Sequence, residues 1–292
     1  MTIIDGKKIA AEIREELKKE IDKLKLTGKS LPGLVAILVG DNPASESYVR
    51  GKSKACEEIG MITKTEKLPS EISENDLLEL IQKYNSDNNF NGILVQLPLP
   101  KHIKEEKVIE AILPSKDVDG FHPISVGNLL IGNDTFLPCT PAGIQELLVR
   151  YNIPIKGKHV VVVGRSNIVG KPIANILLQK KENANAVVTI CHSAAKDISY
   201  FTKQADILIA AIGQPNFVKS EMVKDSVVVI DVGINRVNDE SKPKGYRIVG
   251  DVDFDEVSKK AAFITPVPGG VGPMTIAMLL KNTFKAYLIQ NK

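Results

Sequence analysis

Short apolar runs that alternate with helical segments most constrain how this chain can fold. Each run is long enough for one strand and ends at Gly or Pro: "LVAILVG" (34–40), "GILVQLPLP" (92–100), "HVVVVG" (159–164), "ADILIAAIG" (205–213) and "SVVVIDVG" (226–233). Nearly continuous Val, Ile and Leu is typical of strands that are buried on both faces of a parallel sheet. We therefore predict an α/β protein whose parallel strands are covered by helices.

The alternation begins twice, which indicates two domains. A turn-rich stretch at 113–143 separates the two series, and the helix that opens the second has Thr140 as a suitable N-cap and Pro141 at its first position. The 292 residues are enough for two hydrophobic cores. We predict one α/β domain at 1–139 and a Rossmann-type domain at 140–272. Because no long linker joins them, we expect close packing with a cleft between the two.

Charge and composition exclude several function classes. The 38 basic and 35 acidic residues leave a net charge of only +3, which gives no electrostatic case for nucleic-acid binding. The apolar runs are strand-sized and the N-terminal segment has no signal-like apolar core, so we expect a cytoplasmic protein without a membrane partner. Cys56, Cys139 and Cys191 and the four histidines lack metal-site spacing, so we predict reduced thiols and no protein-held metal.

A glycine turn lies between a strand and a helix in "HVVVVGRSNIVGKPIANILL". In this arrangement the amides of a helix N-terminus can bind a phosphate. The general fingerprint G-x-G-x-x-G is not met, because its positions hold Gly164, Ser166 and Val169, with Gly170 one residue late. A plain strand-to-helix connection is the alternative, but the strand before and the helix after favour a nucleotide site.

The end of the next strand favours NADP over NAD. NAD sites usually place an acidic residue there to bind the ribose 2′-hydroxyl. This chain has Cys191, His192 and Ser193 instead, and Arg165 lies in the glycine turn. No carboxylate at that point would repel a 2′-phosphate, although Arg165 and His192 could also be ordinary surface residues.

The segment "SESYVRGKSKACEEIG" (45–60) predicts a helix with a lysine on its inner face. At about 100° per residue, an apolar stripe contains Ser45, Tyr48, Val49, Lys52, Ala55, Cys56 and Ile59. Helix geometry alone favours snorkelling, in which the Lys52 stem packs and the ammonium reaches water. The alternative is a partly desolvated amine that serves as a general acid or base, with Tyr48 one turn away.

Three other segments could face the same site. Gln96 lies near the carboxyl end of its strand, where open α/β sheets bind ligands, and its amide needs a partner such as a lysine. Asp117 and Asp119 stand in "KDVDG", where turn formation is the plainer explanation. The stretch "TPVPGGVGPMT" (265–275) could form a backbone-lined wall beside a ligand or simply connect two domains.

Six motifs together resemble the bifunctional methylenetetrahydrofolate dehydrogenase/cyclohydrolase family. They cover nearly the whole chain in order: "VGDNPASESYVRGKSKACEEIG", "GILVQLPLP", "KDVDGFHP", "PCTPAG", "GRSNIVGKP" and "TPVPGGVGPMT". The resemblance implies NADP-dependent oxidation of 5,10-methylenetetrahydrofolate to the methenyl form, followed by hydrolysis to 10-formyltetrahydrofolate. It also implies one-carbon metabolism that serves purine biosynthesis, tetrahydrofolate derivatives as ligands, a homodimer through the Rossmann-type domain, and a final helix (273–292) that returns to the first domain.

The resemblance assigns roles to residues around the inward lysine. Lys52 of YVxxK would carry the acid/base work of hydrolysis, Tyr48 would pack on the folate, and Ser45 would assist. Gln96 would donate a hydrogen bond from its amide NH₂ to the neutral lysine nitrogen and so favour the neutral amine. Asp119 would bind the amino group and ring nitrogens of the pterin through its two carboxylate oxygens.

The remaining implied residues bind the cofactor or line the folate pocket. The cofactor set is Gly164, Arg165, Ser166, Ser193 and Ile234. The folate-lining set is Pro268, Gly269 and Gly270. Two alternatives stay open: a dehydrogenase without cyclohydrolase activity, and a non-catalytic NADP-binding or regulatory protein.

Overall fold

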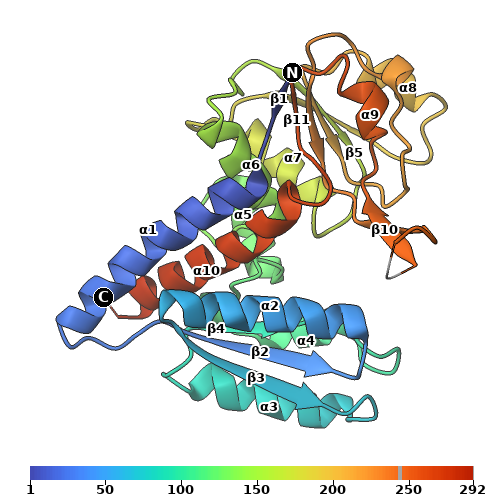
Figure 1. The fold of residues 1–292 in the computed structure, drawn as a ribbon. Coiled ribbons are helices and arrows are strands. Elements are labelled where there is room, and N and C mark those ends of the chain that lie inside the picture. Colours follow the sequence, from blue (N-terminus) through green and yellow to red (C-terminus); the bar gives the residue numbers. More distant parts are fainter. Residues whose placement is uncertain (243–244, 292) are drawn as a thin grey trace. The chain divides into compact units, whose positions relative to one another are not determined.

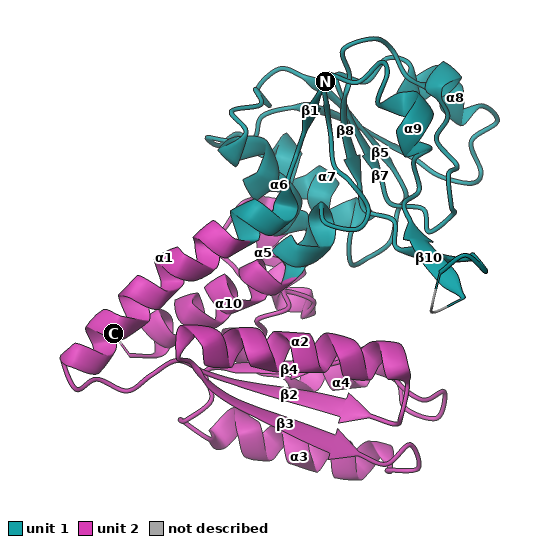
Figure 2. Cartoon of the chain, in the orientation of Figure 1, with its two compact units in different colours: residues 1–10, 140–275 teal, residues 11–139, 276–292 magenta. Residues whose placement is uncertain are grey.

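The computed structural model describes residues 1–242 and 245–291. Two compact units make up the chain (Figure 2). Unit 1 contains residues 1–10 and 140–275, and unit 2 contains residues 11–139 and 276–292. Both units are α/β with parallel strands, so the predicted fold class is confirmed.

The first ten residues belong to a different unit from the one that the sequence suggests. We expected them in the first domain, with residues 11–139, but they are grouped with unit 1. The reason is strand pairing: β1 (Thr2–Ile3) runs parallel to β11 (Phe263–Ile264) at the edge of the unit 1 sheet. A two-residue strand carries no periodic signal, so this pairing could not be read from the sequence.

Unit 2 is built on a three-stranded parallel sheet in the order β3-β2-β4. The strands are β2 (Gly33–Val39), β3 (Ile62–Leu68) and β4 (Gly92–Val95). Figure 1 shows α2 (Pro43–Ile59) on one face of this sheet and α3 (Glu74–Ser86) on the other. The second face is sealed by a buried apolar cluster that joins β2 and β4 to α3 and α4 (Glu105–Ala111). The unit is completed by most of α1 (Gly6–Leu26), by α5 (Pro123–Ile131) and by residues 276–290 of α10 (Val271–Gln290).

Unit 1 contains a six-stranded sheet in the order β1-β11-β8-β7-β5-β6, in which every neighbouring pair is parallel. Its longer strands are β5 (His159–Val163), β6 (Val187–Cys191), β7 (Ile207–Ala210) and β8 (Val228–Asp231). The helices are α6 (Cys139–Arg150), α7 (Gly170–Leu178), α8 (Ile198–Thr202) and α9 (Phe254–Val257). An antiparallel pair, β9 (Asn235–Asn238) and β10 (Tyr246–Val249), follows β8.

The strand register of unit 1 fixes where its loops meet. Val163 at the end of β5 pairs with Cys191 at the end of β6 and with Ala210 at the end of β7. The segments that follow these parallel strands therefore all leave the sheet at the carboxyl ends of the strands, called here the carboxyl edge, which is where α/β sheets bind ligands.

Within the described ranges, no helix is both long enough and apolar enough to cross a membrane.

Candidate active site

The inner face of α2 carries Lys52 into the interior of unit 2. The helix begins after Asn42, whose side chain accepts hydrogen bonds from the amides of Ala44 and Ser45, and ends at Gly60 with φ of 84°. Its buried residues are Ser45, Val49, Lys52, Ala55, Cys56 and Ile59. The predicted stripe is therefore confirmed, except that the Tyr48 side chain at its margin is 45% exposed.

Lys52 is 7% exposed and has a defined partner, so simple snorkelling does not describe it. Its Nζ donates to Oε1 of Gln96 over 3.0 Å, and Gln96 follows directly after β4. The site therefore joins one residue from a helix to one from the carboxyl end of a strand, as the sequence suggested. Sheet and helix both hold the pair rigidly, which suits a group that must move a proton with fixed geometry.

The orientation of the Gln96 amide is the reverse of our prediction. We expected its NH₂ group to donate to a neutral lysine, but its oxygen accepts from Lys52. The physical reason is local: Nε2 of Gln96 donates to the carbonyl oxygen of Leu97 over 2.7 Å, which fixes the NH₂ group away from the lysine. The Gln96 side chain is therefore an acceptor toward Lys52 and a donor toward the Leu97 backbone.

The two aspartates of "KDVDG" have different surroundings. Asp117 is 3% exposed and accepts hydrogen bonds from the amides of Gly120 and His122 and from the hydroxyl of Ser125. Its carboxylate therefore forms the turn, as the plainer explanation supposed. Asp119 is half-buried and makes none of these bonds, so its oxygens are not used by the turn.

Asp119 lies near the side chains of Lys52, Asp117 and Cys139. Burial raises the pKa of the Asp119 carboxyl, the charge of Lys52 opposes this shift, and Asp117 adds to it. Sγ of Cys139 lies 3.8 Å from Oδ1 of Asp119 and 3.4 Å from the carbonyl oxygen of Val118. Burial, and next the charge of Asp119, raise the pKa of the Cys139 thiol well above its usual range, so it stays protonated and can donate.

Two residues near this site were not identified as contributors from the sequence. Cys139 was read only as a reduced thiol, although its place in "PCTPAG" could have marked it. Lys116, the first residue of "KDVDG", is 4% exposed, and its Nζ donates to the carbonyl oxygens of Tyr84 and Asp87 over 2.8 Å each. It therefore ties the motif to the end of α3, where helix carbonyls lack partners.

The glycine turn of unit 1 requires glycine at two positions. Gly164 has φ of 127°, and a Cβ there would lie 2.1 Å from the carbonyl oxygen of Ala211. A Cβ on Gly170 would lie 2.2 Å from the carbonyl oxygen of Gly164. Close backbone approach therefore sets the spacing of these two glycines, and the serine between them at position 166 occupies a point where glycine is not needed.

The predicted cofactor residues lie in loops at the carboxyl edge of this sheet. Oγ of Ser166 accepts hydrogen bonds from the amides of Val169 and Gly170 at the start of α7, and its own hydroxyl proton remains to be donated. Arg165 in the same turn and Ser193 after β6 are both exposed. Ile234 follows β8 and is 51% exposed.

The segment that leads into α10 packs against the start of α1. The carbonyl oxygen of Gly269 accepts from the Lys7 amide over 3.1 Å, and a Cβ on Gly6 would lie 1.7 Å from the carbonyl oxygen of Gly270. Gly269 and Gly270 are buried and Pro268 is exposed. Of the three predicted folate-lining residues, the two glycines therefore serve close backbone packing within unit 1.

Two further carboxylates hold the carboxyl-edge loops of unit 1. Asp231 accepts from the amides of Gly233, Asp251 and Val252. Asp251 in turn accepts from the amides at 212 and 213 and from Nδ2 of Asn235. Neither residue was predicted from the sequence, although an acidic residue at the end of a buried strand, as Asp231 is in β8, is a usable signal.

Asp231 makes the stability of the protein depend on pH. Burial raises its pKa to about 6, against the opposing amide hydrogen bonds. Because the folded-state pKa exceeds the unfolded one, this contribution is fully present below about pH 4 and is lost as pH rises through about 6. We expect the free energy of unfolding of wild type, relative to Asp231→Asn, to fall by about 2 kcal/mol between pH 4 and 7.

Urea unfolding followed by circular dichroism at several pH values measures this difference. Asp255→Asn, which removes an exposed carboxyl from the same unit, is the matched control and should show no such trend. A constant difference between wild type and Asp231→Asn across this range would contradict the prediction.

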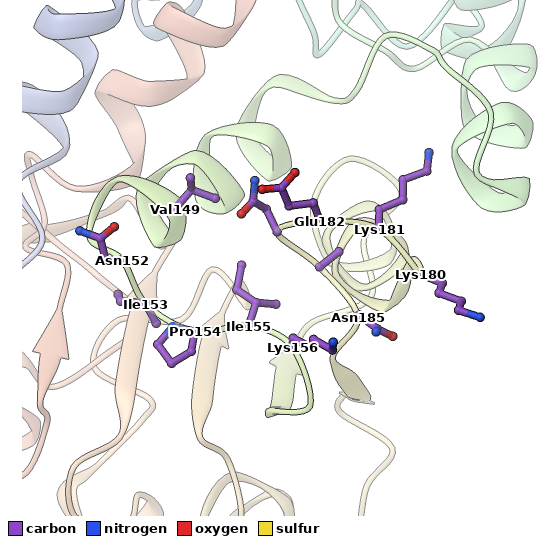
Figure 3. Close-up of a pocket in the computed structure, with 12 residues that line it drawn as sticks. Val149, Asn152, Ile153, Pro154, Ile155, Lys156, Lys180, Lys181, Glu182 and Asn185 are labelled. Carbon is purple, nitrogen blue, oxygen red and sulfur yellow. The ribbon is translucent and has the colours of Figure 1, made fainter.

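A separate hollow of about 640 Å³ lies in unit 1 and is lined by none of the predicted site residues (Figure 3). It is formed by the end of α6 and the segments that follow α6 and α7, including Val149, Ile153, Pro154 and Lys180.

Among the described residues, no group of three or more His, Cys, Asp or Glu side chains could hold a metal ion.

Two family profiles match most of the chain. Residues 4–119 match the catalytic domain of tetrahydrofolate dehydrogenase/cyclohydrolase. Residues 138–291 match the NAD(P)-binding domain of the same family. The two matched ranges contain all of the residues that the sequence motifs place in the folate and cofactor sites.

Full-length relatives agree with these matches. The chain is 57% identical to the bifunctional protein FolD of Chlorobium phaeobacteroides over 290 residues, which are 99% of this chain and 97% of that protein. The crystal structure of the bifunctional enzyme FolD, a methylenetetrahydrofolate dehydrogenase/cyclohydrolase from Campylobacter jejuni, is 53% identical, with a TM-score of 0.93 and 99% of both chains covered. A Trypanosoma brucei methylenetetrahydrofolate dehydrogenase-cyclohydrolase, solved with NADP cofactor and an inhibitor, is 40% identical, with a TM-score of 0.95 and 100% and 99% of the two chains covered. This chain therefore belongs to the tetrahydrofolate dehydrogenase/cyclohydrolase family, as its six sequence motifs predict.

Proposed function

We propose that this chain oxidises 5,10-methylenetetrahydrofolate with NADP⁺ and hydrolyses the methenyl product to 10-formyltetrahydrofolate, using Lys52, Gln96 and Asp119. The bifunctional activity and the NADP cofactor follow from family membership. The roles of individual residues are our assignment. The observation that carries it is the 3.0 Å hydrogen bond between the buried Lys52 and Gln96, beside a carboxylate that the turn does not use.

The loops at the carboxyl edge of unit 1 fit a dinucleotide with a 2′-phosphate. The close approach of Gly164 and Gly170 places the turn directly against the start of α7, where Oγ of Ser166 takes up the amides of Val169 and Gly170. Arg165, Ser166 and Ser193 would bind phosphate oxygens, and no carboxylate follows β6 to repel a 2′-phosphate. Ile234 offers exposed apolar surface near these loops. The bound cofactor would supply the hydride acceptor for the first step.

The first step needs positioning more than acid or base chemistry. Asp119 would accept two N–H hydrogen bonds from the flat edge of the pterin, which orients the methylene carbon. The exposed ring of Tyr48, one turn before Lys52 on α2, would pack on the folate. Ser45, buried at 6% exposure on the same face, would assist around Lys52.

The second step needs a group that moves protons. Water adds to the electrophilic C=N⁺ carbon, and the Lys52 amine would take the proton that the water loses. The resulting ammonium would return that proton to N5 as the bond from carbon to N5 breaks, and the hydroxyl proton leaves as the formyl C=O forms. The Gln96 oxygen, which accepts from Lys52, would hold the ammonium in place between these two transfers.

A direct assay tests this function against both alternatives. Purified protein with NADP⁺ and 5,10-methylenetetrahydrofolate should first gain and then lose methenyl absorbance. A stable methenyl signal would indicate a dehydrogenase alone, and the absence of any signal from folded protein would indicate a non-catalytic NADP-binding protein. Repeating the assay with NAD⁺ should give a much higher Michaelis constant for the cofactor.

The product and the thiols indicate where the enzyme would act. We infer a role in one-carbon metabolism, because 10-formyltetrahydrofolate donates formyl groups of the kind that purine biosynthesis uses. We also infer a cytoplasmic location, which suits Cys56, Cys139 and Cys191, all buried and free of disulfides.

We further propose a homodimer that uses the free edge of the unit 1 sheet. β6 is the last strand of that sheet, and Val187 and Ile190 on it are 63% and 41% exposed. A hydrophobic edge strand in a soluble protein is usually covered, and a second copy of the strand would cover it. Family resemblance supports the same assembly.

Val187→Lys is expected to weaken the dimer at least about tenfold, because each dimer would bury two new charges at the edge. Sedimentation velocity over a range of concentrations measures this change. Leu26→Lys adds the same charge at a leucine that is 88% exposed in unit 2, and it should leave the dissociation constant unchanged. An unaltered dimer in Val187→Lys would place the interface elsewhere.

A further inference from the structure

An asparagine on the last helix binds two backbone carbonyls, one beside Asp119 and one close to Cys139. Asn282 belongs to the part of α10 that lies in unit 2. Its Nδ2 donates to the carbonyl oxygen of Val118 over 2.8 Å and to that of Leu137 over 2.9 Å. The same Nδ2 also lies 3.8 Å from Sγ of Cys139, the side chain that contacts Asp119.

These two acceptors are close to the functional side chains in sequence. Val118 directly precedes Asp119, and Leu137 lies two residues before Cys139. The segment between Asp119 and Cys139 contains α5. The Val118 carbonyl also accepts from Sγ of Cys139 over 3.4 Å. Val118 itself is fully buried, and a Cβ on the neighbouring Gly92 would lie 2.6 Å from its side chain. The peptide that bears Asp119 is thus held on one side by β4 and on the other by Asn282.

We propose that Asn282 is a positioning residue for substrate binding, which fixes the 118–119 peptide so that the Asp119 carboxylate meets the pterin. This inference rests on the proposed role of Asp119 in binding the folate. Asn282 acts through two backbone carbonyls and through Sγ of Cys139, since none of its hydrogen bonds goes to the Asp119 carboxylate itself. A peptide that is free to rotate would carry the carboxylate away from its binding geometry, and small misplacements cost affinity steeply.

The docking of α10 onto unit 2 does not depend on Asn282 alone. Lys285 donates to the side chain of Asp134 and to the carbonyl oxygen of Thr135. Gln290 donates to the carbonyl oxygens of Asn91 and Ser115. These residues tie the same helix to the same unit without touching the peptides beside Asp119 or Cys139. They therefore separate helix docking from the positioning of Asp119.

The test compares Asn282→Leu and Asn282→Ala with Lys285→Met and Gln290→Ala. We expect both Asn282 variants to raise KM for 5,10-methylenetetrahydrofolate about tenfold, with kcat and KM for NADP⁺ changed less than about twofold. The alanine variant leaves room for water at the two carbonyls, so it should fold even if the leucine variant does not. The two control variants should leave KM for the folate unchanged.

A double-mutant cycle shows whether Asn282 acts through Asp119. In an Asp119→Ala background, Asn282→Ala should change KM for the folate less than about twofold, because the group that it positions is absent. Equal effects in the two backgrounds would overturn the proposal, as would an equal loss in Lys285→Met. If Asp119→Ala alone left KM unchanged, the proposed role of Asp119 would fail and this inference with it. If Asp119→Ala raised KM but the Asn282 variants did not, this inference alone would fail.

Discussion

Lys52→Met is expected to lower the rate of methenyl hydrolysis at least about a thousandfold, because general acid–base catalysis contributes factors of about 10² to 10⁴. Methionine keeps most of the apolar stem that packs on the inner face of α2 but has no nitrogen to carry a proton. Hydride transfer to NADP⁺ does not use that proton, so dehydrogenase turnover should persist and the methenyl product should accumulate. Stopped-flow measurement of the methenyl absorbance resolves the two steps separately.

Lys54→Met is the matched control for this experiment. It makes the same substitution two residues along the same helix, at a lysine whose side chain is 74% exposed. Both activities should match wild type, since Lys54 faces away from the buried stripe. Hydrolysis by Lys52→Met at the wild-type rate would remove Lys52 from the mechanism and leave its hydrogen bond with Gln96 as a structural contact.

Features that repeat along the chain could be predicted from the sequence. The parallel sheets follow from runs of Val, Ile and Leu, and the inward position of Lys52 follows from helical spacing alone. Each of these signals repeats over several residues, so no knowledge of distant segments is needed. The glycine turn was harder to predict, because backbone contacts that only the folded structure shows require glycine at positions 164 and 170.

Features that depend on single contacts between distant residues could not be predicted. The Gln96 amide takes its orientation from the Leu97 carbonyl, which reverses the hydrogen bond that chemistry alone suggested. Asn282 meets Val118 across 164 residues of sequence, and β1 pairs with a strand near the other end of the chain. No local pattern marks such contacts. They decide which atom of the Gln96 amide faces Lys52 and how the Asp119 carboxylate is aimed, so the mechanism depends most on contacts that sequence periodicity cannot show.

Asp119→Asn is expected to lower kcat/KM about a hundredfold or more for both activities, because both steps would use the same bound pterin. The amide has almost the same shape but offers one acceptor oxygen in place of two, and its NH₂ group would oppose an N–H donor on the pterin. A charge-assisted pair of hydrogen bonds is worth a few kcal/mol, which corresponds to about this factor. Steady-state kinetics of the dehydrogenase and cyclohydrolase reactions measure the two losses in one preparation.

The neighbouring aspartate provides the contrast that makes this result specific. Asp117→Asn, two residues earlier in the same motif, keeps only one of the two acceptor oxygens, so it loses the hydrogen bond from the amide of either Gly120 or His122. It should lower the melting temperature of the protein, whereas Asp119→Asn should leave it unchanged or raise it, since burial already disfavours the Asp119 charge. Equal destabilisation by the two variants, or a loss confined to one of the two activities in Asp119→Asn, would contradict the assignment of Asp119 to the shared pterin. The sign of the stability change therefore distinguishes a carboxylate kept for the substrate from one kept for the turn.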